Sequence, residues 1–129
     1  MPDLILIADD DLDNREIAKE ILEAHGYEVI IATNGLETLE LARSRKPAAI
    51  LMDMSMPKLD GWQATKMLKA DPETKNIIVI AYTAHASRTD EARAMAGQCD
   101  DYISKPCHPN LLLAKVKDWL ERLRQKKAC

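Results

Sequence analysis

The sequence lacks any long apolar stretch. No run approaches the roughly 18 apolar residues that a membrane-spanning helix requires, and the polar start Met1-Pro2-Asp3 does not have the character of a signal peptide. Internal repeats, low-complexity segments and linkers are missing as well. These absences predict one domain over residues 1–129, located in the cytoplasm and without a membrane partner.

An excess of positive charge is missing too. The chain has 18 lysines and arginines against 21 aspartates and glutamates, a net charge of −3, which argues against binding to the phosphate backbone of a nucleic acid. The three cysteines, Cys99, Cys107 and Cys129, are odd in number and lack the spacing of metal ligands. Neither a disulfide framework nor a zinc site is indicated, and reduced thiols are expected.

The sequence does contain five short apolar runs, each followed by an amphipathic stretch. The runs predict strands at residues 4–8, 27–32, 48–52, 77–81 and 102–104. The first is continuously apolar rather than alternating, which is typical of a parallel strand covered on both faces. Five such units in sequence predict an α/β fold with three layers, a doubly wound five-stranded parallel sheet of the flavodoxin-like order 2-1-3-4-5.

Helix boundaries can be predicted from capping residues. Asp13 with Glu16 predicts the start of the first helix and Gly26 its end, while Asn34 with Glu37 predicts the start of the second. The helix near residues 87–96 has the thinnest apolar face. The side chains predicted to face the core from the other helices are Ile17, Ala18, Ile21, Leu22, Leu36, Leu39, Leu41, Ala42, Ala64, Met67, Leu68, Leu112, Val116, Trp119, Leu120 and Leu123.

Polar side chains stand where four of the five strands end. Asp9 and Asp10 follow the first strand, Asp53 the third, Thr83 the fourth and Lys105 the fifth. The second strand lacks such a residue, as expected for an edge strand in the predicted order. In this class of sheet, ligands bind at the carboxyl ends of the central strands. Residues far apart in the sequence are therefore expected to form one pocket.

The carboxylates predict a magnesium site. Three neighbouring carboxylates repel one another unless a cation joins them, and Mg²⁺ prefers oxygen ligands in a site left open for a phosphate. Asp10 and Asp53 could ligate Mg²⁺ directly, Asp9 through water, and the backbone carbonyl of Ser55 could supply another oxygen. Considered singly, Asp9, Asp10 and Asp11 could instead be helix-entry caps, and Asp53 could be an ordinary loop carboxylate.

The same residues could carry phosphoryl transfer. A carboxylate such as that of Asp53 can attack phosphorus and form an aspartyl phosphate. The Lys105 ammonium, together with Mg²⁺, would balance the charge of the phosphoryl oxygens, and the Thr83 hydroxyl would donate a hydrogen bond to them.

Four segments resemble the motifs of bacterial two-component receiver domains of the stand-alone, CheY-like type. They are LIADDD at 6–11, LMDMSMPKLDG at 51–61, AYTA at 81–84 and DYISKP at 101–106. The resemblance implies that Asp53 is phosphorylated from a phosphohistidine on a sensor histidine kinase or a histidine phosphotransfer protein.

Further roles follow from the same resemblance. It implies that Asp9 and Asp10 hold Mg²⁺, that Thr83, Ala84 and Lys105 contact the phosphoryl group, and that Thr83 and Tyr102 form the switch. With no residues left for an output domain, the chain is expected to signal through contact with a downstream target protein. It is not expected to be an enzyme beyond its own phosphoryl transfer and autodephosphorylation.

Departures from the family pattern and two other functions are also considered. Cys107 replaces a residue that is often bulky and apolar in the family, and Ser55 and His85 occupy variable positions thought to tune dephosphorylation. An aspartyl-nucleophile phosphatase would need a second acid two residues after Asp53, where this chain has Ser55. A receiver-like interaction module that is never phosphorylated is disfavoured by the intact set of acids, threonine and lysine.

Overall fold

A computed structural model describes residues 3–53, 61–83, 99–104 and 109–128, with the backbone alone at 61, 83, 104 and 126–128. The strands are β1 (Leu4–Ala8), β2 (Glu28–Ala32), β3 (Ala49–Met52), β4 (Ile78–Thr83) and β5 (Asp101–Ser104). The helices within the described residues are α1 (Leu12–Ala24), α2 (Gly35–Arg45), α3 (Gly61–Ala70) and α5 (Pro109–Ala128). The predicted helix near residues 87–96 lies outside the described residues. No described helix is both long enough and apolar enough to cross a membrane.

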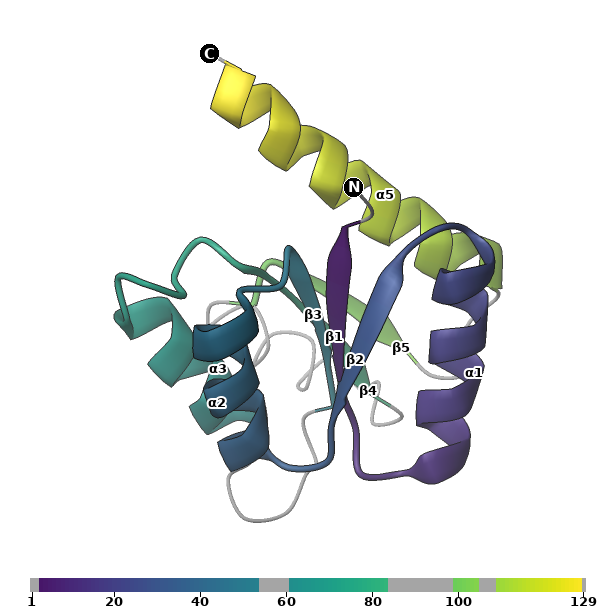
Figure 1. Ribbon diagram of the computed structural model, residues 1–129, viewed down its shortest axis with the longest axis horizontal. Helices are drawn as coiled ribbons and strands as arrows, with labels where there is room; N and C mark the ends of the chain where they lie inside the picture. The colour runs from purple at the N-terminus through teal and green to yellow at the C-terminus, as the bar shows by residue number, and fades with distance from the viewer. Residues whose placement is uncertain (1–2, 54–60, 84–98, 105–108, 129) are drawn as a thin grey trace.

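The five strands form one parallel sheet in the order β2-β1-β3-β4-β5. Leu6 of β1 lies opposite Ile30 of β2 and Ile50 of β3. Helices α1 and α5 cover one face of the sheet, and α2 and α3 cover the other (Figure 1). The predicted flavodoxin-like architecture and strand order are confirmed, and each strand begins within one residue of its predicted start.

Apolar side chains fill both faces of the sheet. Leu6 and Ala8 of β1 pack in the cluster under α2 and α3, whereas Ile5 and Ile7 pack in the cluster under α1 and α5. None of the four side chains is more than 1% exposed. Because successive residues of a strand point to opposite faces, a strand covered on both sides needs an apolar residue at every position. This explains the continuous apolar run that predicted β1.

The N-terminal caps of α1 and α2 differ in how well the sequence predicted them. Asn34 caps α2 as predicted, its Oδ1 accepting a hydrogen bond from Glu37 N at 2.9 Å. The prediction of Asp13 as the cap of α1 is wrong, because Asp11 is the cap and accepts from the backbone N–H groups of Asp13 and Asn14. With three consecutive aspartates before the helix, the sequence offered several candidate caps. The C-terminal end of α1 agrees with the prediction, since Gly26 follows it with a φ of +89°.

Three of the predicted core side chains are exposed. Ile17 is 54% exposed, Leu36 55% and Met67 44%. Ile17 and Met67 each precede a fully buried residue, Ala18 and Leu68, and neighbouring positions on a helix point about 100° apart. The apolar stripe that contacts the sheet is therefore narrower than the apolar composition of each helix. The other predicted core side chains are buried or partly buried.

Cys99 is a buried free cysteine two residues before β5. Burial raises the pKa of its thiol to about 11, partly offset by a hydrogen bond to Thr65. The thiol therefore stays protonated and packs as a small apolar group. Cys107 and Cys129 lie outside the described residues.

Candidate functional site

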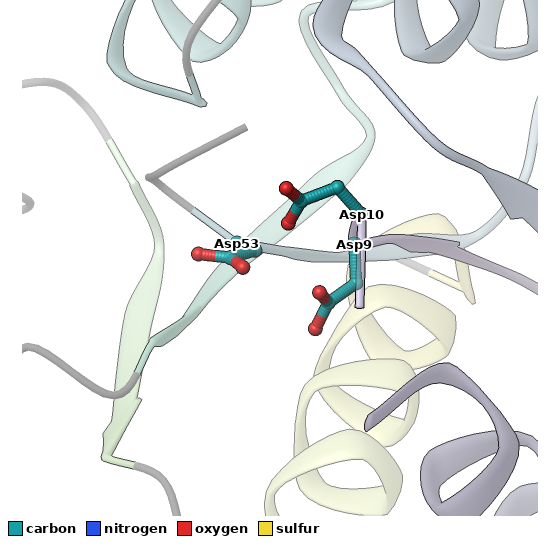
Figure 2. Close-up of side chains that lie close together, drawn as sticks. All are labelled: Asp9, Asp10 and Asp53. Carbon is teal, nitrogen blue, oxygen red and sulfur yellow. The ribbon is translucent and has the colours of Figure 1, made fainter. Parts of the chain in front are cut away.

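Three carboxylates meet where β1 and β3 end. Asp9 directly follows β1 and Asp53 directly follows β3, and the last residues of these strands, Ala8 and Met52, lie opposite each other. The backbone of each aspartate is fixed by a neighbouring strand, since Asp9 N donates to Ala32 O at 3.0 Å and Asp53 N donates to Ala8 O at 2.8 Å. Asp10 completes the group, and carboxylate oxygens from the three residues lie within 4.8 Å of one another (Figure 2).

The three carboxylates differ in exposure and in their local contacts. Asp9 is 1% exposed and Asp53 9%, whereas Asp10 is exposed. Asp9 Oδ1 accepts a hydrogen bond from Asp11 N at 2.9 Å, which fixes the turn into α1. The helix-cap explanation of the acidic segment accounts for Asp11 and for part of the role of Asp9. It does not account for Asp10 and Asp53.

The donor set fits a magnesium ion. An octahedral Mg²⁺ with ligands at about 2.0–2.1 Å places neighbouring ligand oxygens about 3 Å apart and opposite ones about 4 Å apart. Carboxylate oxygens from three residues within 4.8 Å of one another therefore need only small side-chain adjustments to share one ion. Two of the residues are buried or nearly so, and anions removed from water are stabilised most by a cation close to them.

Arg15 is a cation beside this cluster that the sequence analysis missed. Its Nη1 donates a hydrogen bond to the backbone carbonyl of Asp9 at 3.2 Å. Arg15 lies three and seven residues before Ala18 and Leu22, which are the buried residues of α1. Residues at this spacing share one face of a helix, so the sequence could have predicted that Arg15 lies on the inner face of α1.

The residues predicted to contact a phosphoryl group are described only in part. Thr83 is the last residue of β4 and lies opposite Ser104 of β5, but its side chain is outside the description. Ser55, Ala84 and Lys105 also lie outside the described residues. Strands β1, β3 and β4 are neighbours that run in one direction, so the backbone of Thr83 stands at the same edge of the sheet as the carboxylates.

Tyr102 is the predicted switch residue that the structure places. It lies on β5 opposite Ala81 of β4. Its side chain is partly buried and packs against the apolar cluster under α2 and α3.

Comparison with known proteins identifies the family. Residues 5–117 match the sequence profile of the response regulator receiver domain. The chain belongs to the response regulator receiver family. It is 42% identical over 120 residues to the polar-differentiation response regulator DivK of Brucella anthropi, covering 93% of this chain and 98% of that protein.

Solved receiver structures share the fold. A CheY-like response regulator receiver domain protein from Methanospirillum hungatei aligns with a TM-score of 0.90 and 29% identity, over 98% of this chain and 99% of that chain. The receiver domain of a sensor histidine kinase from Pseudomonas aeruginosa aligns with a TM-score of 0.88 and 28% identity, over 94% and 99%. That structure has a magnesium ion coordinated in its active-site cleft.

Receiver domains of this family act as phosphorylation-dependent switches in two-component signalling. Their general role is that of a signalling protein that works with sensor histidine kinases and downstream targets, and not that of an ordinary metabolic enzyme. The resemblance seen in the sequence motifs is thereby confirmed at the level of family, fold and general function.

Proposed function

We propose that Asp53 is the phosphoryl acceptor of this receiver and that Asp9, Asp10 and Asp53 hold Mg²⁺, with the backbone carbonyl of Ser55 as a further ligand. The observation that carries the proposal is the meeting of three carboxylates at the ends of two central strands. When bound, the ion would neutralise part of the negative charge that gathers as a phosphoryl group approaches a carboxylate.

Asp53 is a better nucleophile candidate than the other two acids. Asp9 is almost completely buried and accepts a hydrogen bond from Asp11 N. Asp10 is exposed and lies in the turn between β1 and α1. Asp53 follows β3, the middle strand of the sheet, and keeps 9% of its surface exposed. It therefore combines a fixed backbone with access for a phosphodonor.

The proposed transfer balances as a simple displacement. A carboxylate oxygen of Asp53 attacks the phosphorus of a phosphohistidine, a P–O bond forms, and the P–N bond breaks. The imidazole of the donor leaves with the electron pair of that bond and takes up a proton. Hydrolysis of the aspartyl phosphate by water would return Asp53 to its free carboxylate, which is the autodephosphorylation that we include in the proposal.

The remaining roles rest on the family resemblance. Thr83, Ala84 and Lys105 would contact the phosphoryl group, and Tyr102 would move with Thr83 as the switch. The phosphodonor would be a sensor histidine kinase or a histidine phosphotransfer protein, and the output a contact with a downstream target protein. We also propose a cytoplasmic location and a single receiver domain over residues 1–129, on the basis of the family.

An intact-mass measurement tests the acceptor. The protein is mixed with Mg²⁺ and the small phosphodonor phosphoramidate, and we expect a gain of one phosphoryl group that Asp53→Asn abolishes. Asp13→Asn is the matched control, because Asp13 is an exposed acid of α1 outside the cluster. Persistent labelling of Asp53→Asn would contradict the assignment. If the protein instead hydrolysed a phosphomonoester continuously, an aspartyl-nucleophile phosphatase would be favoured. If it gained no phosphoryl group, a receiver-like interaction module that is never phosphorylated would be favoured.

A further inference from the structure

A second concave site lies at the opposite edge of the sheet. Helix α5 extends past the edge at which β1 begins, away from the carboxylates (Figure 1). A pocket of about 390 Å³ opens between α5, the loop before β4 and the residue before β5. Its lining residues are Lys69, Lys75, Asn76, Ile78, Asp100, Trp119, Arg122 and Leu123. A volume of this size suits a ligand or an inserted side chain.

The pocket is positively charged in a negatively charged protein. Three cations and one carboxylate line it, so the lining carries two positive charges, whereas the whole chain has a net charge of −3. An adjoining pocket of about 350 Å³ has two cations and two carboxylates in its lining. The net positive charge is therefore a property of the pocket lined by Trp119 and not of all residues at this end of the sheet.

The cations of the pocket are of two kinds. Lys69 is an inner cation, with Nζ at 2.8 Å from Asp100 Oδ2 and 2.9 Å from Ile77 O. Arg122 and Lys75 are exposed. The Arg122 guanidinium lies over the Trp119 ring at 4.7 Å from its centroid, and its ion pair with Asp118 joins two exposed side chains, a kind of pair that holds weakly.

Lys75 is, with Arg122, one of the two outer cations of the pocket. Its side chain makes no ion pair with any residue of the described part. Lys75 stands in the loop after α3 and Arg122 on α5, so the two outer cations come from different elements. The lining also contains the apolar side chains of Ile78, Trp119 and Leu123. Cations from two elements together with apolar side chains favour a ligand that carries both carboxylates and an apolar group.

The walls of the pocket are held in place before any ligand binds. Asp100 Oδ2 accepts hydrogen bonds from Val79 N and Lys69 Nζ, both at 2.8 Å. Trp119 Nε1 donates to Asp101 Oδ2 at 2.8 Å, which fixes the indole on the edge strand. Because these groups are already ordered, binding would lose little conformational entropy.

We infer that this pocket docks an acidic peptide segment of a partner protein. One bulky apolar side chain of the segment enters the pocket against Trp119 and Leu123, and flanking carboxylates pair with Lys75 and Arg122. Tryptophan and arginine around a preorganised pocket are the residues most enriched at the energetic centres of protein interfaces. Complementary charge at the rim would select an acidic partner.

The docking site is separate from the phosphorylation site. The pocket includes Ile78 at the start of β4, and a strand of this length rises about 17 Å from its first to its last residue. A partner bound here would leave Asp53 open to a phosphodonor. Docking is therefore expected to be independent of phosphorylation, and its failure would not affect the proposed acceptor.

A nuclear magnetic resonance titration of the whole chain tests the inference. The probes are acetyl-Glu-Glu-Leu-Glu-Glu-amide and the matched peptide with lysine in place of glutamate, and the signals are the Trp119 indole N–H and the backbone amides of the lining residues. We expect saturable shifts with the acidic peptide alone. The paired change Lys75→Glu and Arg122→Glu should weaken binding about tenfold or more.

The control variants separate docking from general attraction. Lys66→Glu with Lys117→Glu makes the same charge change at exposed positions of α3 and α5 outside the pocket, and it should leave binding nearly unchanged. Asp53→Asn should also bind normally. Equal weakening by the control pair, equal shifts with the lysine peptide, or equal shifts with acetate alone would each overturn the inference, the last by showing a simple anion site.

Discussion

The two ends of the parallel sheet carry sites of opposite charge, a cluster of carboxylates where the strands end and a pocket lined mainly by cations where they begin. At the carboxyl edge, carboxylate oxygens of three aspartates that follow two strands lie within 4.8 Å of one another, a donor set that fits a divalent cation. At the amino edge, Lys69 is paired with Asp100, Arg122 forms an exposed ion pair with Asp118, and Lys75 forms no ion pair within the described residues. The carboxylate cluster is thus expected to respond to a bound cation, whereas hydrogen bonds and an ion pair already order the walls of the pocket at the other end of the sheet.

Breaking the inner ion pair of the amino edge should have the largest effect. Lys69→Met would leave the Asp100 carboxylate without its cation, and the two side chains are only 13% and 24% exposed. Removal of one partner from such a pair should lower the free energy of unfolding by about 3 kcal/mol. Urea unfolding checks this, with Lys66→Met as the control on the exposed face of α3. Equal loss in both variants would show that Lys69 acts only through its aliphatic stem.

Binding of Mg²⁺ to the carboxylate cluster should raise the free energy of unfolding by nearly as much as Lys69→Met lowers it. Mg²⁺ at about one hundred times its dissociation constant should stabilise the protein by about 2.7 kcal/mol, through mass action. Asp10→Asn should reduce that gain, because Asp10 contributes one of the three clustered carboxylates, and Asp13→Asn should not. Thermal melting with and without Mg²⁺ measures both. Melting that ignores Mg²⁺ in the unmodified chain would mean that the site is misplaced.

The sequence predicted the carboxyl edge far better than the amino edge. Asp9 and Asp53 could be found because each directly follows an apolar run, and parallel strands bring such ends together. The strand order followed from the same alternation. Lys69, Asp100 and Trp119 come from a helix, a loop and the last helix, and nothing in their spacing indicates that they meet. Their contacts depend on how α3 and α5 pack, which a single sequence does not specify.

Smaller errors of the sequence analysis have local causes. The helical spacing places Ile17 and Met67 near the buried face of their helices, but the sheet covers only a narrow stripe of each helix and leaves both side chains exposed. The acidic segment permits several helix starts, and the backbone conformation makes Asp11 the cap in place of the predicted Asp13.

Asp101 joins β5 to α5 and should give a smaller, pH-dependent effect. Burial raises the pKa of its carboxyl, but the hydrogen bonds from Trp119, Lys115 and the Tyr102 backbone together lower it below its usual value. A lowered pKa in the folded state stabilises the protein above the unfolded pKa of about 4, and this stability is lost as the pH falls toward the folded pKa.

Asp101→Asn tests this coupling between edge strand and helix. At pH 7 it should lower the free energy of unfolding by about 1.5 kcal/mol, the value typical of hydrogen bonds to a charged group. The difference from the unmodified chain should shrink below pH 4. Asp118→Asn, an exposed acid on α5, is the control. A difference that does not depend on pH would contradict a role for the ionised carboxylate.

The smallest effect concerns the cap of α1, which directly follows the carboxylate cluster. The Asp11 carboxylate accepts from two backbone N–H groups of the first turn, at 2.9 and 3.1 Å, so Asp11→Ala should cost about 1 kcal/mol in urea unfolding. Asp13→Ala should cost only about 0.3–0.5 kcal/mol, because Asp13 interacts with the helix dipole without capping. Both are measured with a chelator present, so that any loss of bound Mg²⁺ does not contribute. A larger loss for Asp13→Ala than for Asp11→Ala would indicate that Asp13 is the cap, as the sequence predicts. It would also mean that Asp11 does not hold the turn that positions Asp9 and Asp10.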